Sequence, residues 1–68
     1  MMKKHLYELD YRIPDDDYIV GIGYFTSLRE VREYITTVKD DPELFTCFRH
    51  PLNPKEPYDP VQVQIFRK

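Results

Sequence analysis

The chain has 68 residues, with six Tyr, four Phe, no Trp and a formal net charge of −2. That length suits one small domain over residues 1–68, and a single cysteine excludes a disulfide framework and fits a reducing, cytoplasmic compartment. One cysteine and two histidines are too few for a four-ligand zinc site, and no apolar run approaches the roughly 20 residues that span a bilayer. The acidic net charge also lacks the basic footprint typical of nucleic-acid binding.

Two strands are predicted near the N-terminus. Residues 6–13 alternate between apolar and charged side chains, which is the period of a half-buried strand. Pro14 and the three aspartates after it end this pattern with residues that favour turns. Residues 18–25 are rich in aromatic and β-branched side chains and predict a second strand. The two strands are therefore expected to form a hairpin.

Gly21 and Gly23 lie inside the second predicted strand, and strict alternation places both on one face. Glycine weakens a strand interior unless something approaches closely. We expect the helix or an aromatic ring to pack over this gap, and the alternative is a shallow groove for a ligand backbone. The pair is not a dinucleotide fingerprint, because no third glycine opens the helix that follows.

A helix of about three turns is predicted next. Ser27 and Glu30 form a capping box, in which the serine oxygen accepts the N–H of Glu30 and the glutamate reaches back to the N–H of Ser27. Arg29 can pair with Glu33 one turn later. Asp40-Asp41-Pro42 ends the helix, since the residue before a proline avoids the α region. The apolar positions that recur at helical spacing are Leu28, Val31, Ile35 and Val38.

Residues 44–49 and 61–66 read as a third and a fourth strand, the latter with Val61, Val63 and Ile65 pointing inward. The order β-β-α-β-β predicts an α+β fold: a single, mostly antiparallel sheet of about four strands with one helix on one face. The strand order is not readable, although local pairing favours two hairpins joined through the helix. One helix cannot cover such a sheet, so the opposite face is expected to be aromatic and partly exposed.

The segment between the last two strands carries Pro51, Pro54, Pro57 and Pro60 at a spacing of three. This is the repeat of a polyproline II helix, so the four rings would form one ridge in a segment reaching roughly 30 Å. We expect a stiff connector between the two strands. The alternative is a ligand for an aromatic groove on another protein, with Pro54, Pro57 and Tyr58 as binding residues.

No catalytic, metal or cofactor site is expected. Cys47 and His50 stand three positions apart in a strand, so their side chains should diverge, and Cys47 reads as a packed thiol beside Phe45. The aspartates at 15–17 and 40–41 are adjacent rather than spaced as in a calcium-binding loop, and they read as solvated turns.

The strand-to-helix junction Gly23-Tyr24-Phe25-Thr26-Ser27 resembles that of small uncharacterised bacterial and phage-type β-β-α-β-β domains. In those domains a strand ends in Gly-x-Phe/Tyr-x-Ser and a capped helix follows. The resemblance covers residues 21–31 of the 68. It departs at Val31, where alanine is common, and in the proline segment. It implies the fold and a mobile-element origin, without an activity or site residues.

These features predict a small non-catalytic binding or regulatory module that acts through protein–protein contacts. Self-association into a homodimer is expected, because the aromatic content exceeds what a chain of this size covers by itself. The alternative is a small nucleic-acid-binding module that stacks bases on an aromatic sheet face, with Tyr7 and Tyr11 as the stacking residues. For these two tyrosines we expect the core or a dimer contact instead.

Overall fold

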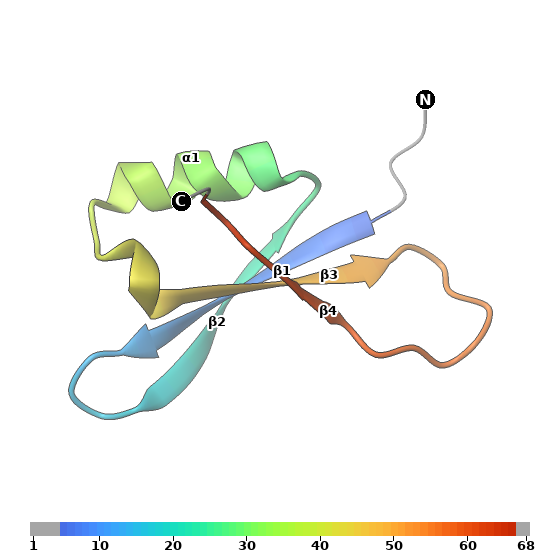
Figure 1. Ribbon diagram of the computed structural model, residues 1–68, viewed down its shortest axis with the longest axis horizontal. Helices are drawn as coiled ribbons and strands as arrows, with labels where there is room; N and C mark the ends of the chain where they lie inside the picture. Colours follow the sequence, from blue (N-terminus) through green and yellow to red (C-terminus); the bar gives the residue numbers. More distant parts are fainter. Residues whose placement is uncertain (1–4, 67–68) are drawn as a thin grey trace.

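The computed structural model describes residues 5–66. It confirms the predicted α+β fold and the order β-β-α-β-β (Figure 1). A short 3-10 turn, η1, lies between the helix and the third strand. The elements are β1 His5–Ile13, β2 Tyr18–Phe25, α1 Leu28–Val38, η1 Pro42–Leu44, β3 Phe45–Pro51 and β4 Val61–Val63.

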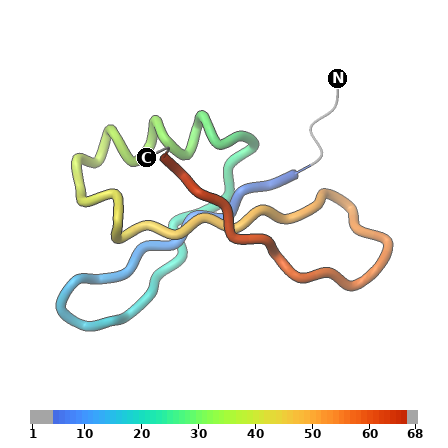
Figure 2. The backbone as a smooth tube through the Cα atoms, viewed as in Figure 1, coloured from blue at the N-terminus to red at the C-terminus, as the bar shows by residue number. Residues whose placement is uncertain are grey.

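All neighbouring strands are antiparallel, in the order β2-β1-β3-β4. The two expected hairpins, β1–β2 and β3–β4, are both present. They join where β1 pairs with β3, with Leu9 opposite Cys47 near the middle. β2 and β4 are therefore the edge strands. The helix lies over one face of the sheet and leaves the other open (Figures 1 and 2).

The helix begins as predicted, at the N-cap Ser27, whose hydroxyl accepts the Glu30 N–H at 3.2 Å. The second half of the capping box was predicted at the wrong residue. The Glu30 carboxylate accepts the backbone N–H of Thr26 at 3.0 Å and its hydroxyl at 2.8 Å, because Thr26 offers two donors to one oxygen. Arg29 and Glu33 pair at 3.4 Å as expected.

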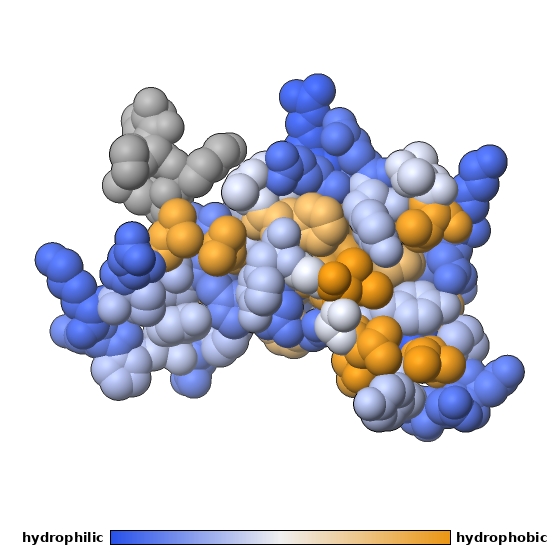
Figure 3. Space-filling view, turned by 180° about the vertical axis from the view of Figure 1, so that it is seen from behind, coloured by the Kyte–Doolittle hydropathy of each residue, from blue (hydrophilic) through white to orange (hydrophobic). Residues whose placement is uncertain are grey.

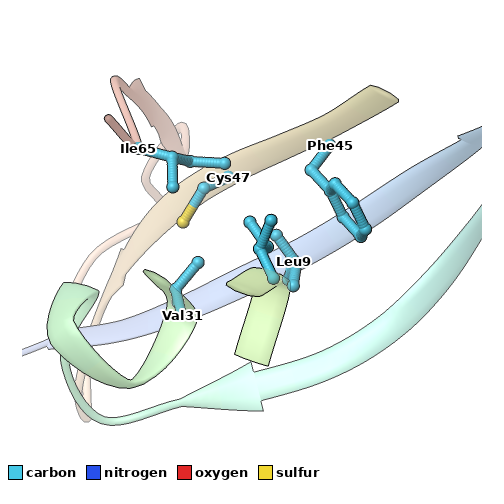
Figure 4. Packing of buried hydrophobic residues seen from close by; sticks show 6 residues of the cluster. Leu9, Val31, Phe45, Cys47 and Ile65 are labelled. Atoms are coloured by element: carbon cyan, nitrogen blue, oxygen red, sulfur yellow. The ribbon is translucent and has the colours of Figure 1, made fainter. Parts of the chain in front are cut away.

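The core lies between α1 and the sheet (Figure 4). Leu9, Cys47 and Val31 are fully buried, and Ile35 nearly so. Val38 lies on the same side of α1, beside a hollow lined by Ile22 and Phe45, but it stands at the end of the helix and is 41% exposed. Phe45 and Ile65 complete the buried cluster.

The C-terminal region differs from the predicted strand 61–66. β4 is only three residues long, and Val61, although the register places it on the helix-side face with Val63, is 49% exposed. After Val63 the chain leaves the sheet toward α1 (Figure 1), where Ile65 is buried and its carbonyl accepts a hydrogen bond from the Arg32 guanidinium. The residues after Val63 thus do not pair with β3. Ile65 nevertheless stays in the core, as its apolar side chain predicted. The third strand is likewise shifted, because Leu44 belongs to η1.

A β-bulge in the β1–β2 pair changes the faces of the two glycines. Leu9 pairs with Gly23 but Asp10 with Gly21, so Ile22 is an extra residue. Paired residues share a face, which places Gly21 and Gly23 on opposite faces and makes the single-face prediction wrong. Gly23 has φ +157°, a conformation that favours glycine.

The expected packing over the glycines is also absent. A Cβ built at Gly23 would meet nothing within 4 Å, and one at Gly21 would meet only the Asp10 carboxylate, at 3.8 Å. The two glycines therefore flank the bulge, and neither the helix nor an aromatic ring packs over them.

Candidate functional site

The face of the sheet opposite α1, here called the open face, is defined by the register with the buried residues Leu9 and Cys47. Their sequence neighbours point away from the helix. The face mixes acidic, aromatic and aliphatic side chains instead of being simply aromatic. Its residues are Leu6, Glu8, Asp10 and Arg12 on β1, Ile19, Gly21 and Tyr24 on β2, Thr46, Phe48 and His50 on β3, and Gln62 on β4.

Tyr7 and Tyr11 do not belong to this open face. Both are partly buried against the core on the helix side. The Tyr11 ring packs against Phe45 with 5.0 Å between centroids, and its hydroxyl donates to the Asp40 carboxylate at 2.8 Å. That hydrogen bond is the main cause of a raised pKa of the Tyr11 hydroxyl, and desolvation adds to it. Core placement was the fate expected for this pair, and it removes both rings from the surface on which bases would stack.

His50 is the centre of a polar cluster on the open face. Its Nε2 lies 2.7 Å from Glu8 Oε1, and its Nδ1 lies 2.9 Å from the Tyr58 hydroxyl. A neutral imidazole with its proton on Nε2 satisfies both contacts, donating to Glu8 and accepting from Tyr58. Tyr24 and Tyr58 both meet the His50 ring edge-on. The cluster ties β1, β3 and the following loop together.

Asp10 stands beside this cluster. Partial burial raises its pKa, and a hydrogen bond and the like charge of Glu8 add to the effect. Two shallow hollows adjoin Asp10. One of about 130 Å³ is also lined by Arg12, Ile19 and Phe48, and one of about 210 Å³ by Glu8, Gly21 and Tyr24. Both are smaller than the ~300–1,000 Å³ pockets that enclose small-molecule ligands.

The proline segment forms the loop of the β3–β4 hairpin (Figure 2). The predicted continuous ridge and its 30 Å reach are wrong. Asn53 has φ +50°, which a polyproline II helix excludes, and the pairing of Arg49 with Val61 brings the ends of the loop together. Pro54 and Pro57 are exposed, while Tyr58 returns to His50. The five candidate binding residues therefore do not gather in one place.

The outer edge of β2 is the most exposed apolar part of the described chain. Tyr24 is 63% exposed and Tyr18 and Ile19 are each 62% exposed, more than any other large hydrophobic residue between 5 and 66. β2 contains no charged residue and no proline over eight positions. Figure 3 shows hydrophobic side chains at the surface where the β1–β2 hairpin projects beyond the helix. The opposite edge, β4, is short, and Pro60 precedes it.

Cys47 is a packed thiol, as predicted. Its side chain is fully buried. Desolvation, followed by the negative charges of Asp10 and Glu8, raises the pKa of the thiol to about 11. Cys47 faces the helix, whereas His50 lies on the open face. Within residues 5–66, no group of three His, Cys, Asp or Glu side chains is arranged to hold a metal ion.

Sequence reasoning missed the Glu8–His50 pair and the prominence of the β2 edge. Alternation does place Glu8 and Asp10 on one face, but His50 joins them only because β1 pairs with β3, 42 residues apart in sequence for Glu8 and His50. The absence of charge in β2 was visible, whereas its edge position was not.

Nothing in the described part of the chain forms a helix long and apolar enough to span a membrane. No family model, curated protein or solved structure matches the chain. Its function is therefore inferred from its own fold and surface.

Proposed function

We propose that the chain is a small non-catalytic module that binds protein through the β2 edge and the adjoining open face. The observation that carries this proposal is the uncharged, unpaired edge of β2, with Tyr18, Ile19 and Tyr24 as its most exposed apolar residues. An edge strand presents free N–H and C=O groups, and soluble proteins usually protect such edges with charges, prolines, short length or bulges. β2 has the bulge at Ile22 but no charged residue and no proline over its eight positions.

Strand addition is the binding mode that this edge suits. Main-chain hydrogen bonds to the free side of β2 would supply affinity, and alternate side chains would supply specificity. Tyr24 and Ile19 lie on the open face and flank the gap at Gly21. A side chain of the added strand can contact the open face there, beside Glu8 and Asp10.

The open face offers less to nucleic acid. Glu8 and Asp10 stand at its centre, and Tyr7 and Tyr11 pack on the opposite side of the sheet. Phosphate binding needs a basic surface, so the acidic centre supports a protein partner instead. The unpaired Cys47 fits a reducing compartment, and the strand-to-helix junction resembles that of bacterial and phage-type domains. The proposal therefore includes a location in the cytoplasm of a bacterium or phage-infected cell.

Site-specific photocrosslinking tests the proposal. A benzophenone amino acid replaces Tyr24 on β2 in one variant and Thr36, an exposed residue of α1, in a matched control. We expect covalent protein adducts from position 24 after irradiation in bacterial cells and few or none from position 36. Equal labelling at both positions, or no adduct from position 24 in a folded protein, would overturn the proposal.

A further inference from the structure

We infer that the strand added to β2 is β2 of a second copy, paired antiparallel about a two-fold axis between Gly21 and Ile22. This inference rests on the proposed function and names its partner. The two sheets would then join edge to edge into one continuous sheet. Such an interface is isologous, because each copy contributes the same strand.

The bulge limits the registers in which β2 can pair with itself. When a strand pairs antiparallel with a second copy of itself, the numbers of the two residues in every pair add up to the same sum. In a regular strand the paired side chains lie on the same face only when this sum is even. The extra residue Ile22 shifts the alternation of β2, so residues before Gly21 match residues after Ile22 when the sum is odd. A sum of 43 places Ile19 opposite Tyr24 on the open face and Tyr18 opposite Phe25 on the helix side.

This register brings together the side chains that are otherwise exposed. Ile19 and Tyr24 are each more than 60% exposed, and two-fold symmetry brings both pairs into cross-strand contact at once. Aromatic pairs with β-branched residues are favourable across strands. The absence of charge in β2 also means that pairing the strand with itself places no like charges in opposition, which is the usual obstacle to self-pairing of an edge.

Disulfide trapping tests the register directly. Ile19→Cys and Tyr24→Cys chains are mixed and oxidised, and we expect a 19–24 crosslink in the mixture and little product from either chain alone. Within one chain the two positions are about 16 Å apart along the strand, so a doubly substituted chain cannot close this bond internally. The native thiol does not interfere, since Cys47 is buried with a raised pKa.

Charge substitution provides a second measurement by sedimentation equilibrium. Ile19→Lys or Tyr24→Glu alone is expected to weaken the dimer by about tenfold or more, because a charge without a counter-charge then stands opposite an apolar partner across the interface. The double variant should recover most of that loss, since opposite charges then meet in both pairs. Ile19→Lys combined with Thr36→Glu on α1 is the control and should not recover. Far-ultraviolet circular dichroism confirms that each variant is folded.

A chain that stays monomeric at millimolar concentration, a dimer indifferent to Ile19→Lys, or a crosslink in another register would overturn the inference. These failures differ from failure of the proposed function. If the photocrosslinker at position 24 captures a different protein while the chain is monomeric, the edge binds a foreign strand and the self-pairing is wrong. If position 24 captures nothing, both fail.

Discussion

Asp10 shows how the position of one residue in a sheet decides its chemistry. On the first strand it reads as an ordinary outward carboxylate, yet the pairing of β1 with both β2 and β3 sets it beside Glu8, opposite Gly21 and Thr46. Partial burial and the neighbouring carboxylate both raise its pKa above 3.8. The folded chain thus holds a proton on Asp10 more tightly than the unfolded chain does.

The sign of the resulting pH dependence follows from this difference. Stability falls as pH rises from the unfolded pKa through the raised folded pKa, because the folded state binds more protons in that window. Asp10→Asn removes the ionisation and is expected to raise the melting temperature at pH 7. Below the unfolded value of 3.8 the two proteins should melt alike. Asp16→Asn, in the exposed turn, is the matched control, and an equal gain at both pH values would contradict the explanation.

At the scale of the element, α1 is the part that local chemistry specifies best. Ser27 caps it, Glu30 closes the turn before it onto Thr26, and Lys39 ends it in the left-handed conformation at φ 58°, with its N–H bonded to the Ile35 carbonyl. Each of these interactions lies within five residues along the chain. The helix therefore starts where the sequence predicts it, independently of the sheet.

Removing the cap tests this description. Ser27→Ala deletes the acceptor of the Glu30 N–H and is expected to lower the free energy of unfolding by about 1 kcal/mol. Ser27→Asp retains an acceptor and should cost much less. Urea denaturation of the three proteins measures both effects. An alanine variant as stable as the parent would mean that the turn at Thr26 holds the helix start without the serine.

At the scale of the whole molecule, the core is closed by residues remote in sequence. β1 and β3 bring Leu9 against Cys47, α1 adds Val31, and the segment after β4 folds back to bury Ile65 (Figure 4). Arg32 fixes that segment by donating to the Ile65 carbonyl. The core of a chain of this size rarely supplies more than about 3–5 kcal/mol of stability. The contacts of Ile65 are therefore a large share of the total.

Two aliphatic residues at the C-terminal end provide a matched comparison. Ile65 is 8% exposed and Val61 49% exposed, although both were predicted to point inward. Ile65→Val should cost about 0.5–1.5 kcal/mol and Ile65→Ala about 2–5 kcal/mol, enough to unfold much of the population. Val61→Ala should cost far less. Thermal unfolding followed by circular dichroism measures all three, and equal losses at the two positions would show that β4, not the core contact, anchors this end.

The sequence by itself determined the features that depend on neighbours along the chain. These are the alternation that makes β1, the limits of β2, the capped start of α1, the packed thiol at Cys47 and the two hairpins. Period and capping chemistry are local, so they can be read without knowing what the element packs against.

Only the tertiary structure decided the rest. The pairing of β1 with β3 brought His50 to Glu8 and made β2 an edge, and the register of β1 with β2 placed the bulge that separates the faces of Gly21 and Gly23. After Val63 the chain leaves the ladder and buries Ile65. Strand order and register depend on contacts between distant residues, and a single sequence records which residues are apolar but not which strand each one meets.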